Sequence, residues 1–170
     1  SLGTVASGGT DVLPVGQWVH LAGVYNGTNV RIFVNGVLKG ETSDVIGGNI
    51  VNNGNPFTIA QSTSGNIDYF NGKIDEVAVF NAELSDVEIQ NYMGTSLAGT
   101  EPNLVVAYNL EDGAGSTATD NASSSLNGTL NNMEPADWMR TPFGPSDAIS
   151  VYTDLGLCTA ALTFDVAVLD

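Results

Sequence analysis

Residues 17–39 read QWVHLAGVYNGTNVRIFVNGVLK, and this stretch decides the fold. It contains two Asn-Gly pairs, at 26–27 and 35–36, each flanked by residues that favour β-strands. Asn and Gly tolerate the positive φ that a type I′ turn requires, and the twist of that turn matches the strands it joins. The stretch therefore predicts a three-stranded antiparallel meander, with strands at 17–25, 29–34 and 37–42.

The middle strand of this meander has apolar residues on both faces. Val30, Ile32 and Val34 alternate with Arg31 and Phe33, so the two sets point to opposite sides of the sheet. Because Phe33 lies on the second side, we expect that side to be covered as well, as in a two-sheet sandwich.

The charge balance excludes several classes of partner. The 170 residues include 4 Lys or Arg and 19 Asp or Glu, giving a formal net charge of −15. Such a chain cannot neutralise phosphates, so we expect no nucleic acid and no anionic membrane surface as partners. No apolar run reaches the roughly 18 residues of a membrane span, so we expect no membrane insertion. The 20 glycines indicate an all-β domain with many turns. Since the chain opens without Met or a signal peptide, we expect an excised or processed piece of a longer protein, and the acidic surface is compatible with secretion.

Alternation in the strand at 74–80 predicts an unusual carboxylate. Asp75 falls on the same face as Val77 and Val79 if the alternation is unbroken. An ionised carboxylate on an apolar face is costly unless it is paired, hydrogen-bonded or bound to a cation.

Residues 81–93 predict one short helix. Ser85 and Glu88 have the spacing of a capping box, and Leu84 and Ile89 occupy the hydrophobic-staple positions around it. A helix this short is not stable alone in water, so we expect it to dock on the sheet.

The first strand places Trp18 and His20 on one side. Either side chain is able to touch a ligand, but half-buried packing is the ordinary role for both. No second histidine is present to complete a metal site with His20. Farther on, residues 111–139 predict a long polar loop, which is either functional, metal-tied or simply solvated.

Several quoted runs occur in a characteristic order. GQWVHLAGVYNGTNVRIFVNGVLKG, PFTIAQ and YFNGKIDEVAVFNAELSDVEI together resemble the concanavalin A-like, laminin-G/pentraxin superfamily over about residues 13–93. The resemblance implies an antiparallel β-sandwich of the jelly-roll type with one short helix. A complete domain of this kind has several strands before the GQW run, whereas only 16 residues precede it here.

We therefore expect a laminin-G-like domain over residues 1–140, followed by a linker at 141–147. Residues 104–130 look like the opening strand and loop of such domains; they either complete this sheet or start a second one, and we prefer completion. The end of the chain, 148–170, resembles the first half of a hyalin-type (HYR) repeat, which implies a partial Ig-like module.

The resemblances also imply sites. The superfamily implies Ca²⁺ on the rim, for which Asp75, Asp120 and Asn127 are the candidate ligands; hydrogen bonding to turn amides is the alternative role for Asp75. Trp18, Tyr69 and Trp138 are candidates for stacking on sugars, although core packing is the alternative for each. Cys158, the only cysteine, is either a buried free thiol or, as the HYR resemblance implies, bonded to a cysteine outside this chain.

No nucleophile-elbow, zinc-protease or P-loop motif is present. Together with the two resemblances, this implies a non-catalytic extracellular module of a large cell-surface adhesin, of the gliding or attachment kind, in a bacterium of the Bacteroidetes type. Its expected partners are a glycan or surface protein and the neighbouring domains of its own polypeptide. The alternatives are an accessory binding domain of a secreted glycoside hydrolase or protease, and a structural filament or spacer module.

Overall fold

The structure is a computed structural model that describes most of the chain between Pro14 and Val168. The described residues are 14, 16–42, 54, 57–61, 70–93, 95–138 and, for the backbone alone, 160–168.

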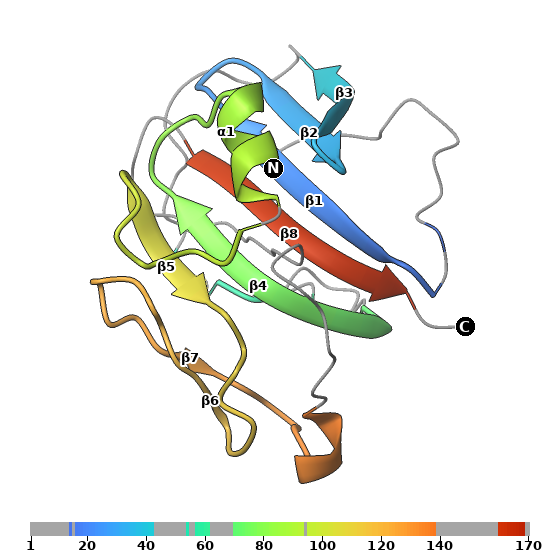
Figure 1. Cartoon of the computed structure of the whole chain (residues 1–170), viewed down its shortest axis with the longest axis vertical. Coiled ribbons are helices and arrows are strands. Elements are labelled where there is room, and N and C mark those ends of the chain that lie inside the picture. The colour runs from blue at the N-terminus through green and yellow to red at the C-terminus, as the bar shows by residue number, and fades with distance from the viewer. Residues whose placement is uncertain are drawn as a thin grey trace.

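Six strands form one antiparallel sheet with the order β3-β2-β1-β8-β4-β5 (Figure 1). They are β1 (Trp18–Tyr25), β2 (Val30–Val34), β3 (Val37–Thr42), β4 (Gly72–Phe80), β5 (Leu104–Tyr108) and β8 (Ala160–Val168). Two short strands, β6 (Thr117–Ala118) and β7 (Gly128–Thr129), pair separately. The helical elements are α1 (Asp86–Tyr92) and the 3₁₀ turn η1 (Pro135–Asp137). The all-β prediction, with antiparallel sheets and one short helix, is confirmed.

The meander β1-β2-β3 forms as its turn residues predict. In the second turn, Asn35 and Gly36 have φ values of 48° and 70°, as a type I′ turn needs. The first turn differs, because Gly27 has positive φ whereas Asn26 does not. There the Asn26 side chain accepts hydrogen bonds from the backbone N–H groups of Thr28 and Asn29, so an Asx turn replaces the expected type I′ turn.

The sheet has a core on each face. On the face that we call the helix-side face, Val24, Phe33 and Phe80 pack against Ile89 of α1, which lies across the front of the sheet in Figure 1. On the opposite face, Val77, Val79, Val106, Tyr108 and Ala118 pack together with the partly buried Ile59, Ile74, Leu110 and Leu130. Both faces are covered, as the position of Phe33 predicts.

Helix α1 begins with the predicted capping box. The Ser85 side chain accepts from the Glu88 backbone, and the Glu88 carboxylate accepts from the Ser85 N–H at 2.8 Å. The Ser85 hydroxyl also donates to the Glu88 carboxylate at 2.6 Å, and this bond, together with that from the Ser85 N–H, lowers the pKa of Glu88. Arg31 of β2 holds this end of the helix through Glu83 at 2.6 Å and Asp86 at 3.0 Å.

A β-bulge in β4 corrects the predicted position of Asp75. Glu76 has a φ of 51°, and the pairing with β8 shifts by one residue between Asp75 and Ala78. The extra residue reverses the alternation. Consequently Ile74, not Asp75, packs with Val77 on the opposite face. Asp75 lies on the helix-side face.

Strand β8 lies at the centre of the sheet. Residues 160–168 pair with β1 on one side and with β4 on the other, so β8 supplies backbone hydrogen bonds to both strands. The separate module expected at 148–170 stays a prediction. Strand β5 pairs with β4, so this part of 104–130 also adds to the same sheet. The predicted linker at 141–147 lies outside the described residues.

Candidate functional site

A row of three polar residues crosses the centre of the sheet. Asp165 of β8 is the register partner of His20 in β1 and also of Asp75 in β4. Residues at directly paired positions of neighbouring strands share a face, so this polar row belongs to the helix-side face. The next row outward has Trp18 and Lys73 as the partners of Ala167.

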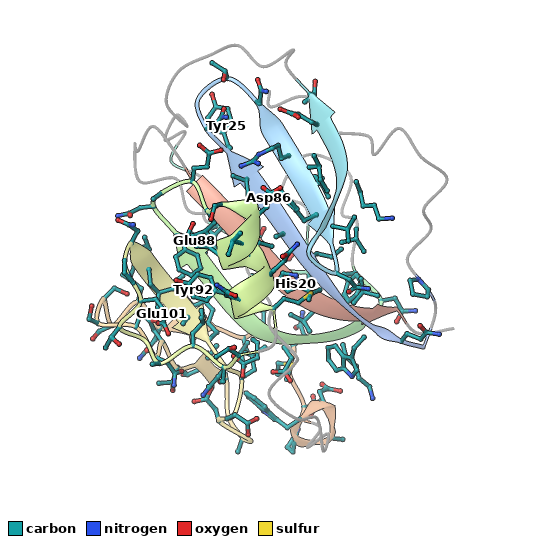
Figure 2. All side chains as sticks on the ribbon, turned by 45° about the horizontal axis from the view of Figure 1, so that its top comes forward. His20, Tyr25, Asp86, Glu88, Tyr92 and Glu101 are labelled. Carbon is teal, nitrogen blue, oxygen red and sulfur yellow. The ribbon has the colours of Figure 1, made fainter. Side chains whose placement is uncertain are left out.

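His20 is buried, with 2 % of its surface exposed (Figure 2). Its backbone is held by Asn35: the His20 N–H donates to the Asn35 side chain at 2.9 Å, and the Asn35 N–H donates to the His20 carbonyl at 2.8 Å. Neither ring nitrogen has a hydrogen-bond partner within the described part of the chain. Burial lowers the pKa of His20 to about 4, so the imidazole is neutral at pH 7.

Asp75 is half-buried, and its carboxylate accepts a hydrogen bond from the Glu76 N–H at 3.0 Å. The backbone-amide alternative predicted for this side chain is therefore present in the structure. Glu76, the bulged residue, turns its carboxylate to the Ser96 hydroxyl, which donates to it at 2.8 Å.

Asp120 organises the loop between β6 and β7. One carboxylate oxygen accepts from the N–H groups of Ala107 and Ala122, and the other accepts from Leu126 N–H and the Ser124 hydroxyl. Burial raises the pKa of Asp120, but these four bonds outweigh it, and the pKa lies below its ordinary value. Asn127 accepts from the Asp120 N–H at 3.0 Å, which brings these two predicted residues together.

The three predicted calcium ligands are not assembled. Asp120 bonds to β5 along its outer edge, so β5 separates it from β4 and Asp75. Both oxygens of Asp120 are already occupied by protein donors, which leaves little capacity for Ca²⁺. Across the described residues, no group of three or more His, Cys, Asp or Glu side chains has a metal-binding arrangement. The geometry does not fit Ca²⁺ held by this set of three.

The predicted aromatic residues lie in different places. Trp18 is half-buried on the helix-side face, one row beyond His20. Trp138, also half-buried, follows η1, and its indole N–H donates to the Gly115 carbonyl at 3.3 Å. Tyr69 and Cys158 lie outside the described residues, so their predicted roles stay predictions.

The antiparallel sheet, covered on one face by a short helix, is consistent with a concanavalin A-like β-sandwich. The family profile described as the concanavalin A-like lectin/glucanases superfamily, of the laminin-G type, matches residues 3–90, slightly more than half of the 170 residues. The chain belongs to this family, whose laminin-G-like members are typically non-catalytic binding modules. No curated protein and no solved structure gives a significant match. In the part of the chain that is described, no helix is long and apolar enough to span a membrane.

Sequence reasoning placed Trp18 and His20 on one side of their strand, and the structure agrees. It missed that two aspartates occupy the same row as His20, because that row is assembled only when β8 inserts between β1 and β4.

Proposed function

We propose that the chain is a non-catalytic extracellular adhesion module of a large cell-surface protein, which binds a carbohydrate or a partner surface. Membership of a lectin-type superfamily supports a binding role. The net charge of −15 supports a partner other than nucleic acid or an anionic membrane.

The observation that carries this proposal is the position of Trp18 beside the polar row. An indole face provides apolar area for stacking on a sugar ring, and neighbouring polar groups fix its orientation. Lys73 and Asp75, both half-buried, lie on the same face across β8 from Trp18, and they supply a donor and an acceptor. Trp138 lies away from this group, against the Gly115 loop, and marks a second candidate position.

The chemistry of the described residues favours binding over catalysis. His20 is the only histidine, and with a pKa of about 4 it is a weak base at neutral pH. Asp120 is committed to the hydrogen bonds of its loop.

A glycan array followed by calorimetric titration tests the proposal. We expect Trp18→Ala to weaken binding of the glycan found on the array by at least about tenfold. The reason is that stacking of an aromatic side chain on a sugar ring contributes on the order of 1 kcal/mol or more. Phe57→Ala is the matched control, because Phe57 is an aromatic residue with 39 % exposure that the proposal leaves unused.

Equal losses in Trp18→Ala and Phe57→Ala would remove Trp18 from the binding surface. A loss confined to Trp138→Ala would move the surface to the Gly115 loop. If neither glycans nor surface-protein extracts are bound by the wild-type chain, the adhesion proposal fails.

A further inference from the structure

We propose that the sugar recognised beside Trp18 is a uronic acid, and that the ammonium of Lys73 binds its carboxylate. This inference rests on the proposed function, because it names the class of glycan bound at the same surface. It assigns Lys73 as the residue that determines specificity, whereas Trp18 provides the stacking surface.

Lys73 differs from the other basic residues of the chain. Of the four Lys and Arg residues, Arg31 forms two salt bridges at the start of α1, and Lys39 also has an interaction partner. Arg140 lies outside the described residues. Within the described ranges, Lys73 forms neither a salt bridge nor a side-chain hydrogen bond. A chain with 19 Asp and Glu residues therefore leaves one ammonium unpaired in the part that the structure describes.

The neighbouring carboxylate of β4 does not neutralise Lys73. Asp75 lies two residues away on the same face, but its carboxylate accepts a hydrogen bond from the Glu76 N–H at 3.0 Å. The salt bridges found among the described residues are both made by Arg31. The positive charge of Lys73 is therefore available to a negatively charged ligand.

Lys73 is also half-buried, although lysine is mostly exposed in proteins. Part of its side chain is covered by the protein, which reduces the rotamer freedom that remains to be lost when a ligand binds. The effective dielectric constant is lower near the protein surface than in bulk water, so the attraction between the ammonium and an anion is stronger there. Both effects favour binding of a carboxylate at this position.

The spacing of Trp18 and Lys73 suits one sugar unit. Both are register partners of Ala167 in β8, Trp18 from β1 and Lys73 from β4, so both lie on the helix-side face. Neighbouring strands are about 4.8 Å apart, which separates the two backbone positions by about 10 Å. A ring that stacks on the indole can therefore direct one substituent toward the ammonium. In a uronic acid, that substituent is a carboxylate.

A singly charged sugar fits this surface better than a neutral or a densely charged one. Hydrogen bonds that involve charged groups are roughly twice as strong as neutral ones, so a uronic acid gains more from Lys73 than a neutral sugar does. Lysine binds as a point charge, and one unpaired ammonium matches one negative charge on the ring. A densely sulfated glycan would be repelled by the net charge of −15.

The test uses the full chain and pairs of oligosaccharides that differ only in one kind of group. Oligomers of galacturonate, glucuronate and mannuronate are compared, by calorimetric titration, with the same oligomers after reduction of their carboxylates to alcohols. We expect the wild-type chain to bind at least one uronate oligomer at least about tenfold more tightly than its reduced form. Lys73→Met removes the charge but keeps an apolar side chain, so it should abolish this preference and leave the affinity for the reduced oligomer unchanged.

Lys39→Met is the matched control, because Lys39 is an exposed lysine of the edge strand β3, away from Trp18. This variant should retain the full preference for the uronate oligomer. Lys73→Arg should retain most of the preference, because a guanidinium group also binds carboxylates.

Equal affinities of the wild-type chain for uronate and reduced oligomers would overturn this inference, without any variant having to fold. If those equal affinities fall together in Trp18→Ala, the proposed function stands without the specificity assigned to Lys73. A preference that persists in Lys73→Met, or that is lost equally in Lys39→Met, would overturn the inference as well. A chain that binds no uronate oligomer also overturns it, whereas the proposed function fails only if the glycan array and the surface-protein extracts show no binding.

Discussion

The helix-side face of β1, β8 and β4 is apolar at one end and polar at the other. Beneath α1, the rows across β1, β8 and β4 end in Ala22, Val24, Ala78 and Phe80, and all four side chains are buried in one apolar core. Beyond the helix, the rows end in Trp18, His20, Lys73 and Asp75. The comparison teaches that the same three strands carry an apolar core at one end and polar side chains at the other, so the two ends should contribute differently to stability.

The largest effect should come from the covered end. Phe80 is fully buried, and its ring stacks on Tyr92 of α1 with centroids 5.3 Å apart. Phe80→Ala should lower the free energy of unfolding by about 3–5 kcal/mol, through lost burial and the cavity left behind. Lys73→Ala, at the polar end of the same strand, should change it by less than about 0.5 kcal/mol. Urea denaturation measures both, and comparable losses would break the contrast between the ends.

The polar end should make stability depend on pH. The pKa of His20 is about 4 in the folded protein and 6.5 in an exposed reference, so between these values the unfolded chain binds more protons. The free energy of unfolding should therefore fall as the pH drops from 6.5 toward 4, by up to roughly 3 kcal/mol.

The charged groups in the rows around His20 are Asp165, Asp75 and Lys73. His20→Gln should flatten this part of the stability curve, while Asp112→Asn should not, because Asp112 is an exposed aspartate that bonds to Thr119, outside these rows. If the unfolding free energy of the wild-type protein does not change between pH 6.5 and 4, burial does not oppose the protonation of His20.

The Asp120 loop should show a smaller loss than the Phe80 core. Asp120→Ala leaves the N–H groups of Ala107, Ala122 and Leu126 without their acceptor, and we expect a loss of about 2–3 kcal/mol in thermal or urea unfolding. Because the folded-state pKa of Asp120 is lowered, its contribution is present above the ordinary pKa near 3.8 and is lost as the pH falls through the folded value. An Asp120→Ala chain as stable as Asp112→Ala would contradict the structural role given to this carboxylate.

The smallest effect concerns α1, the helix that covers the apolar end. Ser85→Ala removes the N-cap of α1 and should cost about 1 kcal/mol, since the Glu88 N–H loses its acceptor. Ser85→Asp should retain most of the stability, because Asp is also a good N-cap. If both variants are equally destabilised, the cap is not the cause.

The parts of the fold that could be predicted are those with local signals. Asn35-Gly36 fixes one turn of the meander, and Ser85 with Glu88 fixes the start of α1, because each effect acts within four residues. Alternation also placed Trp18 and His20 on one side. The strands that pair with β8 were not predicted, since they lie far away in the sequence and no short-range rule selects them.

The error at Asp75 has a similar cause. A period of two is correct only while the strand is regular, and Glu76 is not a residue type that signals a bulge. The shared face of His20 and Asp75 therefore became visible only in the structure, because it depends on the bulge in β4 and on the register of β8 with both strands.

The central position of β8 has a consequence for biosynthesis. Strands β1 to β5 leave the ribosome before residue 160, yet β1 and β4 have open hydrogen-bonding edges until β8 arrives. The nascent polypeptide therefore holds two incomplete half-sheets until residues 160–168 have been made. During that interval, an extended segment from another nascent chain can pair with the unpaired backbone groups of β1 or β4. Slowing translation just before residue 160 should therefore increase aggregation, and speeding it should reduce aggregation.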